Sequence, residues 1–541
     1  MNLTLIVKGL IVKSLGDLDF PEVPIVIEVP PDPNMGDRSC TVALSLAKQL
    51  KQPPRQIAEQ IKNVLPIDSD PITKVEIAGP GYLNFFFSEN ALIHLLQAIL
   101  RLNSDFGNSD RGAGQRRLFE YVSANPTGPM NVVSARAAAL GDSMVKLQRK
   151  IGFSVDSEFY INDAGKQIML LGASVKARAG EVKGNSREIP EGGYHGSYVK
   201  QIAAEAIDEF GDALFTLPDE DLGCWSADRI VENQRSTLED YGIQFDNWFK
   251  ESELRRNNEH QTALKLLEER EHTYSKDGAL FFRSTSFGDN EDRVLITSDE
   301  RPTYFLPDIA YHVNKSKRGY DKVIDLLGPD HHGHGLRMQA AMKAVGLPDD
   351  FLEVVIVQQV NLMRSGKPVK MSKRTGEIIT LKELIEEVGP DAAKQIFLSR
   401  RWSSHLDFDI ETAKDRSEKS PVYYLQYAHA RICSIFRKAG DVQEADSECL
   451  LKLTAPEEQK LLRNLSVFPD TVESAALQLA PNRINSYLND LATSFTRFYH
   501  ECRVLSDDDD LTRARLAICH AVKIVLGEGL RLLGMSAPEA M

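Results

Sequence analysis

Two lysines late in the chain have the type and spacing to do chemistry on phosphates. Lys370 and Lys373 lie in the string VKMSKRTGEIITL, with Met371 and Ser372 between them. Ammonium groups packed this densely on a loop suit a polyphosphate, whose negative charge they would neutralise. A solvated basic turn is the plain alternative for a charge cluster. Because the string K-M-S-K-R is rare, we favour contact with phosphate.

A turn near residue 128 is a second candidate for phosphate binding. In the string SANPTGPMNVVSARAAALGD, Gly128 and Pro129 would shape a turn between a strand and a helix. Unpaired N–H groups converge at a helix N-terminus, so the backbone around Asn131 and Ser134 would face an anion. Many loops contain glycine and proline for turn geometry alone, and in isolation that interpretation is the stronger one.

A doubly wound parallel sheet is the element expected to position both segments. Two strand–helix–strand patterns predict it. The first runs through RLFEYVS, a helix at Ser134–Lys150 and FSVDSEFYI; the second runs through KVIDLLG, a helix at Leu336–Val345 and FLEVVIVQQV. Ligands of such sheets bind beyond the carboxyl ends of the strands. The sequence therefore predicts an α/β core with its site at that edge.

Composition changes along the chain indicate three domains. The first hundred residues combine a helical stretch at Thr41–Val64 with a strand-type run, VEIAGPGYLNFFF, which predicts an α+β domain over 1–105. The stretch Asn103–Gln115 has the composition of a linker. We expect the α/β domain over 116–411, with helical insertions near 165–285, and an all-α bundle over 412–541.

Length, charge and cysteines exclude several classes of protein. The 541 residues, 42% hydrophobic and 26% charged, suit packed domains, and the net charge of −14 argues against histone-like coating of nucleic acid. The six cysteines are dispersed and form no C-x-x-C pair, which favours a reducing cytoplasm. Since no run approaches the roughly 20 apolar residues of a membrane span, we expect no membrane partner.

Several strings resemble the class I aminoacyl-tRNA synthetases, and among them the arginyl-tRNA synthetase family. They stand in family order over 120–435: EYVSANPTGP, EFYINDAGKQI, FDNWF, TYFLPDIAYH, GPDHHG, NLMRSGKPVKMSKRTGEIITL, SSHLDF and PVYYLQYAHARICSI. Further similarities, KVEIAGPGYLNF near the start and LRLLGMSAPEAM at the end, extend the resemblance to the whole chain.

The resemblance implies an activity and its substrates. A Rossmann-type catalytic domain would activate L-arginine with ATP to arginyl-adenylate and transfer the arginyl group to the 3′ end of tRNA(Arg). The N-terminal domain would contact the tRNA and the C-terminal bundle its anticodon. We expect Mg²⁺ to accompany ATP, no metal held by the protein itself, and a monomer.

The resemblance also implies site residues. Those expected to bind ATP are Gly128, Pro129, Asn131, Ser134, Lys370, Met371, Ser372 and Lys373. Asn131, Ser134, Lys370 and Lys373 among them would act in catalysis. A guanidinium is a planar fork of donors, so a specific pocket for it needs carboxylate, carbonyl or phenol acceptors. The residues expected to bind arginine are Glu120, Asn125, Tyr304, Asp308 and His331. Pro307 would place Asp308 in the first turn of a helix. Basic residues expected to meet the tRNA are Arg431, Arg437 and Lys438.

One motif departs from the family pattern. Where the family has H-V-G-H, this chain has Asn131-Val132-Val133-Ser134. Asn131 and Ser134 keep neutral hydrogen-bond donors but cannot become cationic, and Val133 adds a side chain where glycine permits close approach of ATP. Two alternatives therefore stay open: a related enzyme that makes another product from the adenylate or charged tRNA, and a non-catalytic tRNA-binding or regulatory protein.

A histidine-rich segment raises a metal hypothesis. Asp330, His331, His332 and His334 offer metal-ligand side chains within five residues. Neighbouring residues on a turn diverge, whereas a metal site needs ligands that converge on one point. No distant partner is identifiable, so we expect this segment to line the crevice for ATP and amino acid instead.

Overall fold

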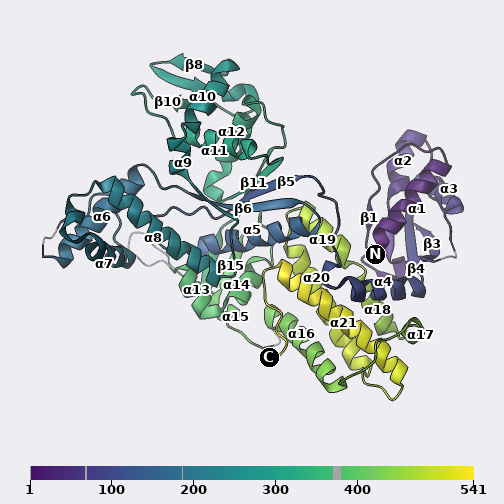
Figure 1. The fold of residues 1–541 in the computed structure, drawn as a ribbon. Helices are drawn as coiled ribbons and strands as arrows, with labels where there is room; N and C mark the ends of the chain where they lie inside the picture. Colours follow the sequence, from purple (N-terminus) through teal and green to yellow (C-terminus); the bar gives the residue numbers. More distant parts are fainter. Residues whose placement is uncertain (1, 68–69, 185–186, 370–378, 418–419) are drawn as a thin grey trace.

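The chain folds into a central parallel sheet flanked by an N-terminal α+β unit and a C-terminal helical bundle. The computed structural model describes residues 2–67, 70–184, 187–369, 379–417 and 420–541. Figure 1 shows the N-terminal unit in purple, the sheet at the centre and the bundle below it in light green and yellow. The mixed α/β architecture expected from the sequence is confirmed.

The central sheet has five parallel strands in the order β12-β11-β5-β6-β7. Its strands are β5 (Arg116–Glu120), β6 (Ser154–Ile161), β7 (Asn247–Lys250), β11 (Lys322–Leu327) and β12 (Leu352–Ile356). Helix α5 (Val132–Lys150) connects β5 to β6, and α12 (His332–Ala344) connects β11 to β12. The strand order therefore reverses between β5 and β11, which is the topological switch point of a doubly wound sheet.

The apolar run expected as a single strand at residues 351–360 is two strands in two sheets. After β12 ends, Gln358 donates its backbone N–H to Trp402 O at 2.9 Å instead of continuing the ladder to β11. The next strand, β13 (Val360–Arg364), pairs in a separate sheet with β14 (Lys367–Pro368) and β15 (Leu406–Asp409). The expectation was wrong because a polar pair, Gln358 and Gln359, changes backbone partners inside the run.

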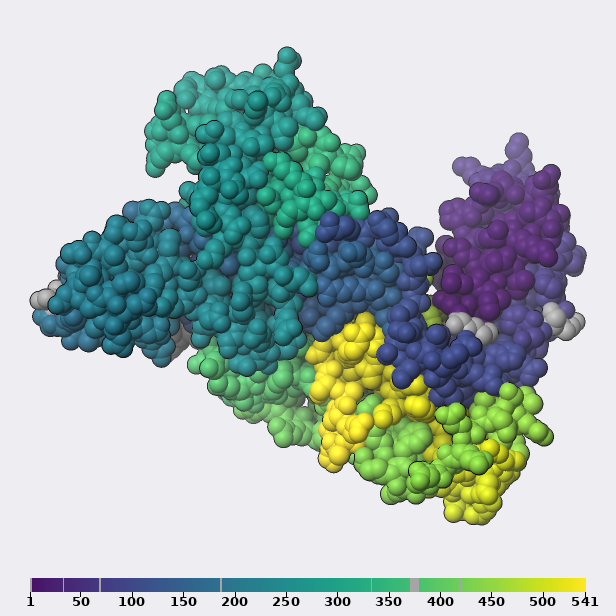
Figure 2. All heavy atoms as spheres, viewed as in Figure 1, coloured from purple at the N-terminus to yellow at the C-terminus, as the bar shows by residue number. Residues whose placement is uncertain are grey.

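Two insertions project from the sheet, and they are the lobes drawn at the left and top of Figures 1 and 2. The first is helical and comprises α6 (Lys166–Val182), α7 (Ser197–Phe210) and α8 (Asp219–Asp240). The second comprises α9 (Glu251–Arg256), α10 (Glu259–Glu269), β8 (Thr273–Lys276), β9 (Ala279–Phe282) and β10 (Arg293–Ile296). Helix α11 (Phe305–Lys317) returns the chain from the second lobe to the sheet.

The N-terminal unit is a four-stranded sheet with helices. Its helices are α1 (Leu3–Asp17), α2 (Val42–Leu50), α3 (Pro54–Val64) and α4 (Glu89–Leu102), and its strands are β1 (Ile27–Glu28), β2 (Arg38–Cys40), β3 (Ile72–Ala78) and β4 (Tyr82–Phe87). The helical stretch expected at Thr41–Val64 is interrupted. Lys51 takes a left-handed φ of 53°, and the prolines that follow cannot donate helical hydrogen bonds.

The C-terminal part is helical and packs on the sheet domain through α5. The bundle has helices α16 (Pro421–Ala439), α17 (Ser447–Leu450), α18 (Pro456–Leu465), α19 (Phe468–Leu477), α20 (Asn482–Glu501) and α21 (Asp509–Leu532), and helices α13 (Leu381–Val388), α14 (Pro390–Phe397) and α15 (Ile410–Ala413) lead into it. A buried ion pair of 2.8 Å joins Lys150 on α5 to Glu528 on α21. Within the described part of the chain, no helix is long and apolar enough to cross a membrane.

Candidate active site

The loops after β5 and β11 leave the sheet at the switch point. Because these strands are parallel neighbours, their carboxyl ends lie at one edge. Asn125 and Asn131 follow β5, and His331 follows β11. Asn125 and His331 are exposed, and Asn131 is half-buried. The predicted site residues of both segments therefore emerge where a doubly wound sheet binds its ligand.

Glu120 ends β5 in a buried network of charges. Its Oε2 accepts a 2.6 Å hydrogen bond from Lys315 Nζ, and its Oε1 accepts one of 2.8 Å from Ser123 Oγ. Lys315 is fully buried and also donates to Asp325 Oδ1 at 3.0 Å. Asp325 is the partner of Glu120 in the β5–β11 register, so the lysine joins carboxylates on two adjacent strands.

Helix α11 positions this network by its own spacing. Asp308, His312 and Lys315 stand four and three residues apart, so they share one face of the helix. The His312 ring lies between Asp308 O at 2.8 Å and Asp325 Oδ2 at 2.7 Å. Burial alone lowers the pKa of Lys315, but the carboxylates of Asp325 and Glu120 raise it above its usual value. Lys315 is therefore a permanent cation beneath the site.

The sequence interpretation missed Lys315, His312 and Asp325. A signal was available, because Asp325 interrupts the otherwise apolar strand KVIDLLG. A charge inside a buried strand requires a partner. Lys315 and His312 lie only 10 and 13 residues before Asp325, whereas Glu120, the other carboxylate that Lys315 binds, lies 195 residues from it along the chain, so no local pattern identifies the whole network.

Asp308 stands in the first turn of α11, as expected from Pro307. Burial raises the pKa of its carboxyl to about 7; the nearby charges of Glu120 and Glu251 add to that shift, and His312 and Lys315 oppose it. His334 Nε2 lies 3.6 Å from Asp308 Oδ2. Burial also lowers the pKa of His334 to about 4, so at neutral pH this ring is uncharged.

Two of the other residues expected to bind arginine, Tyr304 and His331, connect to Asp308 directly or through His334, whereas Asn125 contacts Gln234 instead. Tyr304 precedes α11 with 80% of its side chain exposed, and its backbone carbonyl accepts from Asp308 N at 3.4 Å. The His331 and His334 rings lie 6.0 Å apart. The Tyr304 hydroxyl and the Asp308 carboxylate are thus acceptors at the N-terminal end of α11, the helix that also carries Lys315.

Asn131 caps the N-terminus of α5. Its Oδ1 accepts from Ser134 N at 3.2 Å and lies 3.5 Å from Ser134 Oγ. The neutral side chains are therefore partly engaged with each other, and the Asn131 amide nitrogen has no hydrogen-bond partner among the described residues. Val133 is 48% exposed at this terminus. Gly128 lies at the bend that ends the turn at Pro126–Thr127, and Pro129 follows it.

The two strings expected to contact phosphates meet at this terminus. Leu381 N donates to Met130 O at 2.9 Å, and Thr380 forms an antiparallel bridge with Asn131. At the other end of the lysine string, Val369 N donates to Leu362 O at 2.9 Å. The C-terminal flank of the string is thus anchored at the α5 terminus, and the N-terminal flank is anchored on β13. Lys370, Met371, Ser372 and Lys373 themselves lie outside the described residues.

The residues expected to meet tRNA lie on α16. Arg431 stacks over the Tyr427 ring at 4.6 Å and donates to the Tyr427 hydroxyl at 2.6 Å. The Tyr427 ring lies 6.0 Å from the Tyr423 ring, with the two planes nearly parallel. Arg437 donates to a backbone carbonyl of the C-terminal segment at 3.1 Å, and Lys438 is exposed. Helix α16 therefore presents stacked aromatic rings together with cations.

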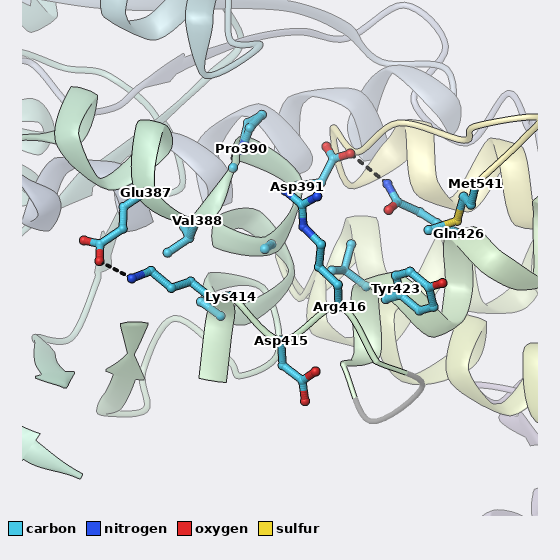
Figure 3. Close-up of a pocket in the computed structure, with 14 residues that line it drawn as sticks. Glu387, Val388, Pro390, Asp391, Lys414, Asp415, Arg416, Tyr423, Gln426 and Met541 are labelled. Carbon is cyan, nitrogen blue, oxygen red and sulfur yellow. Dashed lines mark hydrogen bonds and ion pairs between the residues drawn. The ribbon is translucent and has the colours of Figure 1, made fainter. Parts of the chain in front are cut away.

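A cavity of about 550 Å³ lies at the joint between α13–α15 and α16. Figure 3 shows two polar pairs across it: Glu387 with Lys414 at 2.5 Å, and Asp391 with Gln426 at 2.8 Å. Met541 lies beside Gln426. The cavity is lined by none of the residues expected to bind arginine or ATP, and it marks the joint between the sheet domain and the bundle.

Of the side chains in the metal hypothesis, that of His332 lies outside the described residues, and the described ones include no group of three or more histidine, cysteine, aspartate or glutamate side chains that could hold a metal ion. The His331 and His334 rings stand nearly perpendicular at 6.0 Å. His334 instead lies beside Asp308, as part of the crevice.

Comparison with known families assigns each part of the chain. Residues 5–87 match an arginyl tRNA synthetase N terminal domain, residues 96–435 a catalytic domain of tRNA synthetases class I (R), and residues 425–541 a DALR anticodon binding domain. The catalytic match alone spans more than half of the chain.

Individual relatives agree over nearly the full length. The arginine–tRNA ligase of Listeria monocytogenes serotype 4b (strain F2365) is 45% identical, covering 99% of this chain and 98% of its own. That of Moorella thermoacetica is 43% identical, with 98% and 96% covered. The arginyl-tRNA synthetase structure from Thermus thermophilus has the same fold, with a TM-score of 0.79 at 23% identity over 99% of both chains. The chain belongs to the arginyl-tRNA synthetases, the class I arginine–tRNA ligases.

Proposed function

We propose that this chain activates L-arginine with ATP to arginyl-adenylate and transfers the arginyl group to the 3′ end of tRNA(Arg). One observation carries the proposal: carboxylates fixed by Lys315 stand on β5 and β11 at the switch point, and the loop after β5 leads to the helix terminus that bridges to the flank of the lysine string. A guanidinium and a polyphosphate could bind there side by side. The arginine carboxylate would then attack the α-phosphate of ATP.

For ATP, the proposed contacts are the N–H groups of the α5 terminus and the lysine string. Gly128 and Pro129 shape the approach, and Asn131 and Ser134 supply neutral donors. Lys370 and Lys373, with Met371 and Ser372 between them, would neutralise charge as pyrophosphate leaves. Mg²⁺ would enter with ATP, held mainly by phosphate oxygens.

For arginine, we assign the guanidinium to Asp308, with Glu120 beneath it. Glu120 already gives both oxygens to Ser123 and Lys315, so Asp308 offers the carboxylate not held by a lysine or arginine. Tyr304, Asn125 and His331 would complete the contacts from the rim. Charged acceptors of this kind favour arginine over neutral isosteres.

For tRNA, we assign an anticodon-contacting surface to α16. Stacked rings next to arginine suit unpaired bases, and Arg431, Arg437 and Lys438 add positive charge to bind the tRNA backbone.

We further propose that the chain has three domains, at 1–105, 116–411 and 412–541, and acts as a monomer. Six free cysteines are consistent with a reducing cytoplasm.

The test is ATP–pyrophosphate exchange with arginine, with and without tRNA, followed by analysis of the product. Exchange together with stable arginyl-tRNA supports the ligase. Exchange that ends in a different product supports a related enzyme, and no exchange under any condition supports a non-catalytic tRNA-binding protein. Citrulline in place of arginine is the matched substrate control, since it is neutral and nearly isosteric.

A further inference from the structure

The loop after β5 begins with strained backbone. Val122 has φ 70° and Ser123 has φ 38°, in the left-handed region that non-glycine residues rarely adopt and β-branched residues least of all. Such conformations persist only where the surroundings hold them. Ser123 is held by two hydrogen bonds: its hydroxyl donates to Glu120 and accepts from Tyr160 N at 3.1 Å.

The following turn, residues 125–128, is held by side chains of the helical insertion. The amide of Gln234 on α8 donates to Asn125 O at 3.1 Å and to Gly128 O at 2.9 Å. The hydroxyl of Tyr198 on α7 donates to Thr127 O at 2.5 Å. Three carbonyls of one turn are therefore bound by side chains of the helical insertion.

The contacts are close as well as polar. A Cβ added to Gly128 would stand 3.3 Å from the Tyr198 ring, so the absence of a side chain permits this approach. Gln234 is 1% exposed, and its Oε1 is buried without a hydrogen-bond partner among the described residues. The buried amide is thus oriented by the two carbonyls that it binds.

We infer that Gln234, assisted by Tyr198, is a positioning residue for amino-acid activation. The inference rests on the proposed function, because the turn that Gln234 holds carries Asn125 and leads to Asn131, on the arginine and ATP sides of the crevice. One clamp from the insertion therefore sets the placement of both substrates. Without it, the strained loop relaxes and the reacting groups separate, which costs rate even though no substrate contact is lost.

The test compares Gln234→Met with Thr237→Val in ATP–pyrophosphate exchange. Methionine keeps the length of the side chain and removes both donors. Thr237 is the matched control: it is buried on the same helix, and its hydroxyl bonds only Asn233 O of that helix, at 2.8 Å. We expect Gln234→Met to lower kcat/KM for arginine and for ATP by about 100-fold, and Thr237→Val to stay within about twofold of wild type.

A second readout separates positioning from general damage. Hydrogen exchange of the peptide 122–131 should accelerate in Gln234→Met while α8 and α5 keep their protection. If Gln234→Met does not fold, Tyr198→Phe carries the test, because it removes one hydroxyl and keeps the ring against Gly128; it should lower kcat/KM roughly fivefold to tenfold. Wild-type kinetics in the folded variant, or equal losses in Thr237→Val, overturn the inference. Absence of exchange in the wild-type chain overturns the proposed function instead.

Discussion

The two sides of the crevice are built on different physical principles. On the arginine side, carboxylates are fixed by buried partners, with Lys315 joining Glu120 to Asp325. On the phosphate side, the α5 terminus offers backbone N–H groups and the neutral side chains of Asn131 and Ser134. A guanidinium has one fixed charged plane and suits rigid acceptors. A polyphosphate changes its charge distribution during the reaction, so its cations are best supplied by a separate segment, the lysine string.

The largest effect should come from the lysine string. Lys373→Ala should lower the rate of adenylate formation by at least about 100-fold, because charge redistributing on the phosphates loses its cation. Affinity for tRNA should stay nearly unchanged. Single-turnover adenylation measures the first and filter binding the second. Lys367→Ala is the control, since this exposed lysine lies just before the string. Equal adenylation rates in parent and Lys373→Ala would remove this lysine from the mechanism.

The neutral donors at the α5 terminus should contribute less. Replacing both Asn131 and Ser134 by alanine should raise the activation barrier by about 2.5 kcal/mol, roughly 70-fold in rate, since two hydrogen bonds to developing charge are lost. The variant should also lose about 1 kcal/mol of folding stability, because Asn131 caps α5.

A second variant separates the two roles of Asn131. Asn131→Asp keeps the cap acceptor and removes the amide donor, so it should melt like the parent and still activate slowly. ATP–pyrophosphate exchange kinetics measure the loss of the donor, and thermal melts measure the loss of the cap. If the double alanine variant activates arginine at the parental rate, these two side chains do not contribute, and ATP is bound by backbone groups and the lysine string alone.

The arginine side predicts a change in specificity. Asp308→Asn should raise KM for arginine about 30-fold, since a charge-assisted bond worth about 2 kcal/mol becomes neutral. KM for ATP should hardly move. Asp349→Asn, which removes an exposed carboxylate from the same domain, is the control. An unchanged KM for arginine together with an unchanged preference over citrulline would place Asp308 outside the pocket.

The smallest effect is a pH dependence confined to one substrate. The pKa of Asp308 is raised to about 7, so its carboxylate is ionised above pH 7 and protonated below it. Guanidinium binding requires the ionised form. Between pH 8 and pH 6, kcat/KM for arginine should therefore fall about tenfold, and Asp308→Asn should flatten the profile. A profile for arginine that is already flat in the parent would contradict this placement of the charge.

Much of the fold could be predicted from the sequence because its signals are local. Alternating strand and helix patterns identify both strand–helix–strand units, and Pro307 identifies the first turn of α11. The break at Lys51 and the change of sheet after Ile356 were missed. In each case the outcome depends on backbone conformation or on distant hydrogen-bond partners, such as Trp402 for Gln358.

The residues expected to contact substrate could be predicted from the sequence, and the side chains that hold them in place could not. Motif strings identify the residues that emerge from the sheet, including Asp308 and Asn131. The side chains that hold them come from elsewhere in the chain: Lys315 reaches Glu120, and Gln234 reaches Asn125. An isolated lysine in a helix or glutamine in an insertion has no local signature of such a contact. The support therefore requires three-dimensional structure.

The measurement that tests the central claim most directly is aminoacylation of tRNA(Arg) by the full chain, with arginine and citrulline compared under identical conditions. A site with fixed carboxylates and a working phosphate side predicts stable arginyl-tRNA and little or no product from citrulline. Equal charging of both amino acids would contradict recognition by charge. If neither amino acid is charged onto tRNA, the central claim is contradicted, because Asn131 and Ser134 would then not replace the two histidines of the family motif H-V-G-H in binding ATP.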